Sequence, residues 1–467
     1  MLPNVVVIVL DTARPDHMSL YGYPHPTTPV LNELSREGVV FDRAYSTSSW
    51  TLPSHASLFT GLYPSEHGAT GEHFWLDDRF ATLAEQMRAL GYRTWAASGN
   101  AMVGSISNLD RGFERFFESW RGSTWTMLSL PRALARLADI EPDEGARDAT
   151  RRVTWWIQRD GAESPYFLFV NLIEAHAPYE PPEPYRSRLL EGRRAPSVDI
   201  YGNRFLDYML GLTSVGDEEL DSIRRLYDGE LAYVDHRVGE IVAALRASGS
   251  WDRTLLVITA DHGESLGEHR LMDHQLCVYE TLTRIPLLVV GPGFARGTRV
   301  PGIVQLHDVF ATVLAAVGQR KPPASERAPR DLAAIASGRE PARDIAVSEY
   351  HRPVAVLKML EKKLALAGRT DGPQALARFD RTLRALVLDH WKWIAGSNGE
   401  NELFDLATDP GEEHNLAGKG LAEESTLAAR LTEWTAPLAM AGGEGGEGAL
   451  RADDQAKERL RALGYIE

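Results

Sequence analysis

The sequence predicts an α/β protein, namely a three-layer α/β/α sandwich with a mostly parallel, mixed sheet and a small C-terminal α+β subdomain. Two observations carry this prediction. Continuous β-branched runs such as "NVVVIVLD" are typical of strands buried on both faces of a mostly parallel sheet. These runs alternate with helical segments, and that order places helices on both faces of the sheet.

The alternating strands and helices are predicted over residues 1–340, which therefore form one α/β domain. After the first strand, "TPVLNELSREG" predicts a capped helix that leads into a second strand. Pro53 in "LPSHASLFTGLYP" is typical of a first helical turn. Helix, glycine stop and strand follow in "FATLAEQMRALGYRTWAASGN". Later strands and one long amphipathic helix are predicted in "SPYFLFVNLIE", "RTLLVITAD", "TRIPLLVVGPG" and "DSIRRLYDGELAYVDHRVGEIVAALRASG".

Other parts of the chain depart from this alternation. Residues 120–160 and 185–225 read as insertions that form a helical cap. Short antiparallel strands are predicted in "DIAVSEYH", "RALVLDHWKWIAG" and "ENELFDLATDP", so residues 341–440 form the C-terminal subdomain. Residues 441–467 comprise a Gly-rich linker and a terminal helix that docks back.

Composition narrows the classes of function. The chain has 467 residues, 43% of them hydrophobic, enough for one large domain and a smaller one. A formal net charge of −15 argues against a nucleic-acid partner and against anionic membranes. The single cysteine, Cys277, permits no intramolecular disulfide. The start "MLPNVVVIVLD" lacks a basic region and a long apolar run, so a cytoplasmic protein is expected. The oligomeric state stays open.

Several predicted strands end in polar residues. Asp11, Asn100, His176 and Asp261 each lie at or just beyond the carboxyl end of a buried run. Ligands of α/β sheets bind beyond these strand ends. One polar strand end is usually only the start of a loop, but the repetition predicts a site along one rim of the sheet.

Asp11, Asp261 and His262 form a plausible set of metal ligands. Two carboxylates and an imidazole suit one divalent ion such as Zn, Mn, Mg or Ca. Taken alone, "DHGE" is equally compatible with Asp261 capping a turn and His262 lying in a loop. The segments "VLDTARPDH" and "WTLPSHASLFTG" in the same chain favour the metal site.

These motifs carry a family resemblance. "VLDTARPDHMSLYGY", "TLPSHASLFTGLYPSEHG", "EAHAPYEPP", "TADHGESLGEHRLMDH" and "NELFDLATDPGEEHNLAG" resemble, in this order, the sulfatase-like family of the alkaline phosphatase superfamily. The resemblance implies that Asp11, Asp261, His262 and the Thr51 oxygen hold the metal. Many sulfatases have a second acid where Thr12 stands, so a single ion is expected.

The chain departs from the family at the nucleophile. In sulfatases this motif reads Cys or Ser, any residue, Pro, Ser, Arg, and its first residue is oxidised to formylglycine. Here Thr51 takes the first position and His55 replaces the arginine. Threonine is not a substrate for that oxidation, and superfamily members with an unmodified threonine react at phosphorus. The resemblance therefore implies nucleophilic attack by Thr51 on phosphorus, with His55 among the catalytic residues.

The resemblance also assigns other site residues. His176 matches a histidine that contacts the anionic group or the leaving oxygen. His274 stands where sulfatases often have a substrate-binding lysine, and either imidazole suits a general acid. Asn100 and His269 are expected to bind substrate. In contrast, a solvated or supporting face of the long helix is expected for Asp228, Glu230, Asp235 and His236.

The sequence thus predicts a divalent-metal-dependent hydrolase of small anionic phosphate esters. Phosphodiesters or phosphonate monoesters are preferred, a covalent Thr51 intermediate forms, and sulfate esters are cleaved promiscuously. Three alternatives remain: a sulfatase without formylglycine, a phosphoryl-group transferase, and a non-catalytic binding protein of the same fold.

Overall fold

A nine-stranded sheet forms the centre of the molecule. The computed structural model describes residues 2–121, 143–161, 164–193, 203–319, 325–369, 371–441 and 452–462. The strand order is β11-β2-β10-β6-β1-β5-β3-β4, and β9 pairs with β2. Strand β10 runs antiparallel to β2 and β6, whereas β6, β1, β5, β3 and β4 are mutually parallel. The bounds are β1 Asn4–Leu10, β2 Gly38–Tyr45, β3 Arg93–Ser98, β4 Arg115–Glu118, β5 Tyr166–Leu172, β6 Thr254–Thr259, β9 Arg284–Ile285, β10 Leu287–Val290 and β11 Thr298–Gln305.

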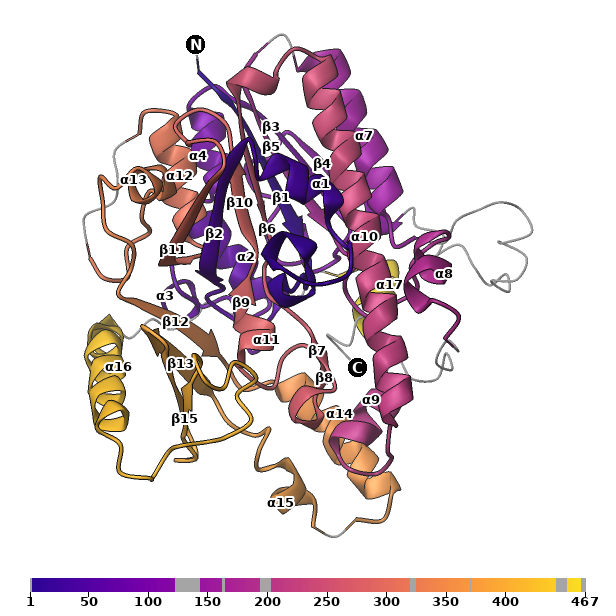
Figure 1. Cartoon of the computed structure of the whole chain (residues 1–467), viewed down its shortest axis with the longest axis vertical. Coiled ribbons are helices and arrows are strands. Elements are labelled where there is room, and N and C mark those ends of the chain that lie inside the picture. Colours follow the sequence, from indigo (N-terminus) through magenta and orange to yellow (C-terminus); the bar gives the residue numbers. More distant parts are fainter. Residues whose placement is uncertain are drawn as a thin grey trace.

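Helices cover both faces of this sheet, which confirms the three-layer prediction. In Figure 1 the sheet runs between α4, α12 and α13 on the left and α7 and α10 on the right. Helix α2 lies near α4 and α12, and α1 packs against α10. The bounds are α1 Pro29–Leu34, α2 Thr51–Thr60, α3 Pro64–His67, α4 Leu83–Ala89, α7 Ala146–Asp160, α8 Tyr185–Leu190, α9 Asn203–Met209, α10 Asp217–Ala247, α11 Glu280–Thr283, α12 Asp308–Ala316 and α13 Leu332–Ala336.

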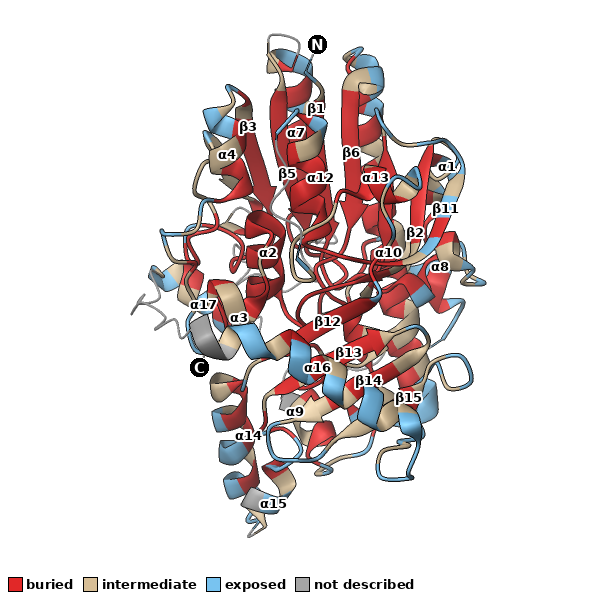
Figure 2. Ribbon diagram, turned by 90° about the vertical axis from the view of Figure 1, so that its left-hand side faces the viewer, coloured by how far each residue is buried: buried red, intermediate tan, exposed pale blue. Residues whose placement is uncertain are grey.

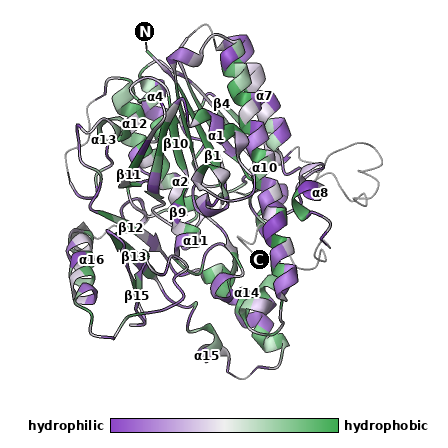
Figure 3. Ribbon diagram, in the orientation of Figure 1, coloured by the Kyte–Doolittle hydropathy of each residue, from purple (hydrophilic) through white to green (hydrophobic). Residues whose placement is uncertain are grey.

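The central strands explain the apolar runs of the sequence. Every residue of β1, β5 and β6 is buried, because helices cover both faces of these strands. Figure 2 shows these strands as buried along their whole length, and Figure 3 shows the sheet as its most hydrophobic region. Polar side chains are therefore concentrated where the strands end.

The C-terminal region forms a second sheet, as predicted. It is antiparallel, in the order β12-β13-β14-β15, and α16 packs against β13 and β14. The bounds are β12 Ile345–Tyr350, β13 Leu383–Leu388, β14 Trp391–Gly396, β15 Glu402–Asp405, α14 Val354–Leu366, α15 Gly372–Leu376, α16 Ala422–Ala441 and α17 Asp454–Ala462.

Hydrogen bonds join this second sheet to the segment that precedes α2. Ser348 Oγ donates to the Ser46 carbonyl at 2.6 Å, and the Glu349 amide donates to the Thr47 carbonyl at 2.8 Å. Ser48 Oγ donates to the Glu349 carbonyl at 2.8 Å. Strand β12 therefore holds the residues just before Thr51.

The ends of the two predicted insertions and the terminal helix have defined positions. Helix α7 packs against α10 and contacts β3, β4 and β5. Arg459 of the terminal helix α17 lies 2.8 Å from Glu144. The remainder of the predicted cap at residues 122–142 and 194–202, and the linker at 442–451, lie outside the described residues.

Of the two expectations for this face of the long helix, solvated or supporting, the acids fit the supporting one, and His236 is exposed. Asp228, Glu230 and Asp235 are all buried in α10. Asp228 pairs with His17 at 2.7 Å. Asp235 accepts hydrogen bonds from the first amides of α1, Val30 N at 2.8 Å and Leu31 N at 3.0 Å. These acids are structural because neighbouring elements cover this face of α10. Over the described ranges, the helices are all too short or too polar to cross a membrane.

Candidate active site

The site lies at the carboxyl ends of four neighbouring parallel strands. Residues beyond β1, β3 and β6 supply Asp11, Asn100 and Asp261, and β5 supplies Asn171 from within the strand. In the sheet, Val9 is paired with Asn171 on one side and Thr259 on the other. This register brings the polar strand ends together, as the sequence predicts.

Asp11, Asp261 and His262 form a compact group of ligand-type atoms. One such atom from each residue lies within 4.8 Å of the other two, and all three residues are buried. Asp11 Oδ2 accepts from Asn100 Nδ2 at 2.9 Å and from Asn171 Nδ2 at 3.1 Å. Across the ranges that the structure describes, Asp11 Oδ1 has no hydrogen-bond donor. The carboxylate is thus fixed through one oxygen and presents the other to the site.

Asp261 is held in a similar way. Its Oδ1 accepts from the backbone amides of Thr12 and His262, at 3.2 and 3.0 Å. Its Oδ2 lies 3.2 Å from His262 Nε2 and 3.4 Å from His55 Nδ1. Backbone amides therefore orient one oxygen, and imidazoles face the other.

Thr51 is the first residue of α2, where the helix dipole supplies positive potential. Its Oγ1 lies 3.2 Å from His262 Nε2 and 3.5 Å from Asn100 Nδ2. His262 Nδ1 donates to the Gly263 carbonyl at 2.9 Å, so Nε2 carries the lone pair of the neutral ring. The hydroxyl, the imidazole lone pair and the carboxylates therefore converge on one point.

The charges and pKa shifts of Asp11, Asp261 and His262 are those expected of a cation-binding site. Burial, reinforced by the charge of Asp261, raises the pKa of Asp11 to about 7. Burial also opposes ionisation of Asp261, but His262 outweighs it and lowers the pKa of that carboxyl below its ordinary value. No lysine or arginine forms an ion pair with either acid among the described residues. The donor set, including the unbonded Asp11 Oδ1, therefore fits a divalent cation.

His55 lies one helical turn after Thr51. Its Nδ1 donates to the Thr51 carbonyl at 2.9 Å, and its Nε2 lies 3.5 Å from Asn171 Nδ2. Burial lowers the pKa of His55, which favours the neutral ring. His55 therefore supports the start of α2 and the Asp261 carboxylate.

His176 and His274 flank the metal-ligand group. The ring centroids of His176 and His274 are 4.8 Å apart, and those of His262 and His274 are 4.7 Å apart. Burial and the neighbouring His274 lower the pKa of His176 to about 3. Burial also lowers the pKa of His274, but Asp273 and Glu264 outweigh it and raise that pKa well above its ordinary value.

His269 has different neighbours. Its ring stacks on Tyr279 with centroids 4.0 Å apart, and Nε2 lies 3.1 Å from the Gly411 carbonyl. Its substrate-binding role remains a prediction, and the structure places it against the C-terminal region.

The sequence reasoning missed Asn171, Glu264 and Asp273. Asn171 is the only polar side chain of "YFLFVNL" apart from the tyrosine, a signal that could have drawn attention. Glu264 stands in the quoted "DHGE", and its Oε1 lies 3.3 Å from His274 Nδ1. Asp273 directly precedes His274 and lies 2.5 Å from the same nitrogen.

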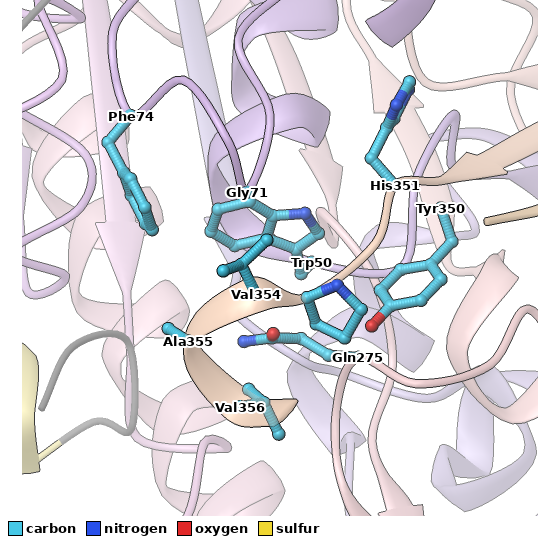
Figure 4. A pocket seen from close by; sticks show the side chains of 10 residues that line it. Trp50, Gly71, Phe74, Gln275, Tyr350, His351, Val354, Ala355 and Val356 are labelled. Carbon is cyan, nitrogen blue, oxygen red and sulfur yellow. The ribbon is translucent and has the colours of Figure 1, made fainter. Parts of the chain in front are cut away.

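A pocket lies beside Trp50, the residue that precedes Thr51 in the chain. It is lined in part by Trp50 and Gln275, which neighbour Thr51 and His274 in the chain, and by Phe74, Tyr350 and Val354. Figure 4 shows aromatic rings and small aliphatic side chains around it, contributed by the 350–356 segment and by Phe74 and Trp50. Its largely apolar lining contrasts with the polar group around Asp11.

A hydroxyl at a helix N-terminus, beside two carboxylates and an imidazole on an α/β sheet, is typical of metal-dependent ester hydrolases. The profile of the family described as Sulfatase matches residues 3–319. The chain therefore belongs to the sulfatase family, within the alkaline phosphatase superfamily, and is an ester-hydrolysing enzyme of that family.

The similar proteins carry names that describe different ester substrates. Arylsulfatase K of Bos taurus is 25% identical, over 92% of this chain and 81% of its own. The multifunctional alkaline phosphatase superfamily protein PehA of Trinickia caryophylli is 26% identical, over 89% of this chain and 91% of its own. Phosphonate monoester hydrolase of Agrobacterium radiobacter shares the fold, with a TM-score of 0.71 and 23% identity over 94% of this chain and 96% of its own.

Proposed function

We propose that the protein is a divalent-metal-dependent hydrolase of phosphate esters, with phosphodiesters or phosphonate monoesters preferred. The observation that carries the proposal is the hydroxyl of Thr51 at the first position of α2, 3.2 Å from His262 Nε2. An unmodified threonine lacks the second hydroxyl by which a formylglycine hydrate expels sulfate. Phosphoryl transfer needs no such group, because water attacks the phosphorus of a phospho-threonine.

In the proposed reaction the Thr51 hydroxyl loses its proton to solvent and its Oγ1 attacks phosphorus, so that the Oγ1–P bond forms and the bond to the alcohol oxygen breaks. A divalent ion held by Asp11, Asp261 and His262 would lower the pKa of the hydroxyl and offset charge on the non-bridging oxygens. Asn100 Nδ2, 3.5 Å from Thr51 Oγ1, is placed to donate to a non-bridging oxygen. His274, whose pKa Asp273 and Glu264 raise, is the better donor of the proton that the leaving oxygen takes, and His176, whose pKa is lowered to about 3, would contact the ester as a neutral ring. Water then releases Thr51 and the phosphate product.

We expect an aryl or otherwise apolar leaving group to contact the rings and aliphatic side chains beside Trp50, because such a group loses contact with water there.

Sulfate ester hydrolysis is the second candidate. The arylsulfatase K relatives favour it, since they align over most of this chain. The two candidates share the metal group and differ in the atom that Thr51 attacks. Promiscuous cleavage of sulfate esters is compatible with both.

The test compares esters that share one aryl leaving group: a phosphodiester, a phosphonate monoester and a sulfate. With metal-loaded protein we expect the highest kcat/KM for one of the phosphorus esters. Thr51→Ala should lower that kcat/KM by about 1000-fold or more. Thr60→Ala is the matched control, since Thr60 ends the same helix and its hydroxyl bonds only to nearby backbone, the Ala56 carbonyl and the Leu62 amide. A higher kcat/KM for the sulfate would establish the second candidate, and an unchanged rate in Thr51→Ala would refute the nucleophile.

A further inference from the structure

A buried tyrosine hydroxyl lies between the backbone groups that follow Asp11. Tyr227, on helix α10, is fully buried. Its hydroxyl donates to the Thr12 carbonyl at 2.8 Å and accepts from the Arg14 amide at 2.8 Å. Burial raises the pKa of Tyr227 well above its ordinary value, so the hydroxyl keeps the proton that it donates. A helix distant in sequence therefore holds the segment directly after Asp11.

Thr12 has a backbone conformation that threonine rarely adopts. Its φ of 57° lies in the left-handed region, which is costly for a residue with a branched β-carbon. Such a conformation persists only where surrounding contacts impose it. The two hydrogen bonds of the Tyr227 hydroxyl are contacts of this kind, because they hold the two peptide groups that follow Thr12.

The conformation of Thr12 also directs its amide to the other carboxylate of the site. Thr12 N donates to Asp261 Oδ1 at 3.2 Å. The peptide group before Thr12 thus faces Asp261, and the peptide group after it faces Tyr227. A change of the Thr12 φ angle would turn one of these groups away from its partner. Asp11 belongs to the peptide group that faces Asp261, so its position depends on this angle.

Arg14 connects the same segment to the loop that follows β6. Its Nη1 donates to the Glu264 carbonyl at 2.8 Å and pairs with Glu268 at 3.0 Å. The arginine side chain also packs closely against Gly263, where an added Cβ would come within 3.1 Å of Arg14 Cγ. Tyr227 holds the backbone of Arg14, and the Arg14 side chain holds this loop. The two segments that carry the metal ligands are therefore joined through one tyrosine hydroxyl.

Contacts of the ring fix where the Tyr227 hydroxyl lies. His17 and Tyr179 each meet the ring edge-on, with centroids 5.2 and 5.6 Å from that of Tyr227. The next residue of α10, Asp228, pairs with His17 at 2.7 Å. The tyrosine is thus held by its own helix and by two neighbouring segments, so its hydroxyl has little freedom to follow a shift of Thr12.

We propose that Tyr227 is a positioning residue of the metal site. Its hydroxyl holds residues 12–14 in the conformation that sets Asp11 against Asp261, so the ligands are in place before a cation binds. The inference rests on the metal site of the proposed function and extends it to a residue that acts through the backbone. Removal of a group that orients metal ligands typically weakens metal binding by about 10- to 100-fold.

Calorimetric titration of the chelator-treated full chain with zinc, manganese, magnesium or calcium chloride measures its affinity for each cation. Tyr227→Phe keeps the buried ring and removes the hydroxyl, and it should weaken binding of the tightest of these cations by about 10- to 100-fold. Tyr233→Phe is the matched control, since Tyr233 is buried in the same helix and its hydroxyl donates to Asp143 at 2.7 Å. This control should bind the cation as the wild type does.

Thermal unfolding of the metal-free variants separates positioning from packing. A lower melting temperature of Tyr227→Phe with an unchanged cation affinity would overturn the inference, because it is the result expected of a merely structural tyrosine. Equal losses of affinity in Tyr227→Phe and Tyr233→Phe would overturn it as well. A wild type that binds none of the four cations would refute the metal site of the proposed function itself, so the two failures are distinguishable.

Hydrogen exchange of the metal-free wild type gives a second test that needs no variant. The amides of Thr12 and Arg14 should be protected before a cation is added, because Asp261 and Tyr227 already accept their hydrogens. Exchange at the rate of an unstructured chain, with protection only after the cation binds, would overturn the inference.

Discussion

Binding of a cation by Asp11, Asp261 and His262 (the Asp11 group) should release protons. Carboxyl and imidazole side chains bind a metal only in their deprotonated forms. Burial and the charge of Asp261 raise the pKa of Asp11 to about 7. At pH 6 such a carboxyl is roughly nine-tenths protonated, and at pH 8 roughly one-tenth. Metal binding should therefore release about 0.9 proton from Asp11 at pH 6 and about 0.1 at pH 8. His262, whose pKa is also raised, adds to the release at the lower pH.

The same shift predicts how affinity and stability depend on pH. From Asp11 alone, affinity for the ion should rise by somewhat less than about tenfold per pH unit up to pH 6, by about fivefold from pH 6 to 7, and then level off, and deprotonation of His262 makes the rise steeper. In the metal-free protein, stability depends on pH in the opposite direction: it falls as the pH rises. A raised carboxyl pKa stabilises the fold at low pH, and this contribution is lost as the pH rises from the ordinary value of 3.8 through about 7.

Isothermal titration calorimetry in buffers of different ionisation enthalpy measures the released protons directly. Asp235→Asn is the matched control, because burial raises the pKa of Asp235 to about 7 as well but this residue caps α1. The Asp235→Asn variant should release as many protons on metal binding as the wild type does. Equal release at pH 6 and pH 8, with an affinity that does not change between them, would refute the reasoning.

Two further predictions concern stability. Arg343→Met should lower the free energy of unfolding by about 3–5 kcal/mol in urea denaturation, because it strands the buried Asp308 carboxylate that lies 2.5 Å away. Arg299→Met, which breaks an exposed pair, should cost less than about 1 kcal/mol, and equal losses would contradict the argument. Gly61→Ala should lower the melting temperature more than Gly91→Ala. Both glycines have positive φ, but only the Gly61 Cβ would come within 2.7 Å of a neighbouring aromatic ring.

The sheet and its helices could be predicted because their causes are local. A strand covered on both faces needs an uninterrupted apolar run, and "NVVVIVL" and "TLLVIT" form such strands, β1 and β6. The glycine at position 91 ends α4 before β3, as its positive φ requires. The rim position of Asp11, Asn100 and Asp261 follows from parallel strand direction alone.

Features that depend on tertiary contacts could not be predicted. Asp228 and Asp235 look solvated because a helix pattern does not reveal that other elements cover both sides of α10. Asp273, Gln275 and Leu276, around His274, have left-handed backbone conformations. None of them is a glycine, so the residue types do not predict this conformation. Asn171 lies inside a strand, and only the sheet register shows that its amide reaches Asp11.

The hydrogen bonds between β12 and residues 46–48 determine which shortened forms of the chain would keep the site intact. The matched family region ends at residue 319, before β12 begins at Ile345. A protein shortened to that region would keep every side chain of the Asp11 group. It would lose the strand that fixes the approach to Thr51 and much of the pocket wall around Tyr350. Strand β12 thus supports both the residues before Thr51 and the pocket wall around Tyr350, so we expect an exchange of the C-terminal sheet between relatives to disturb both at once.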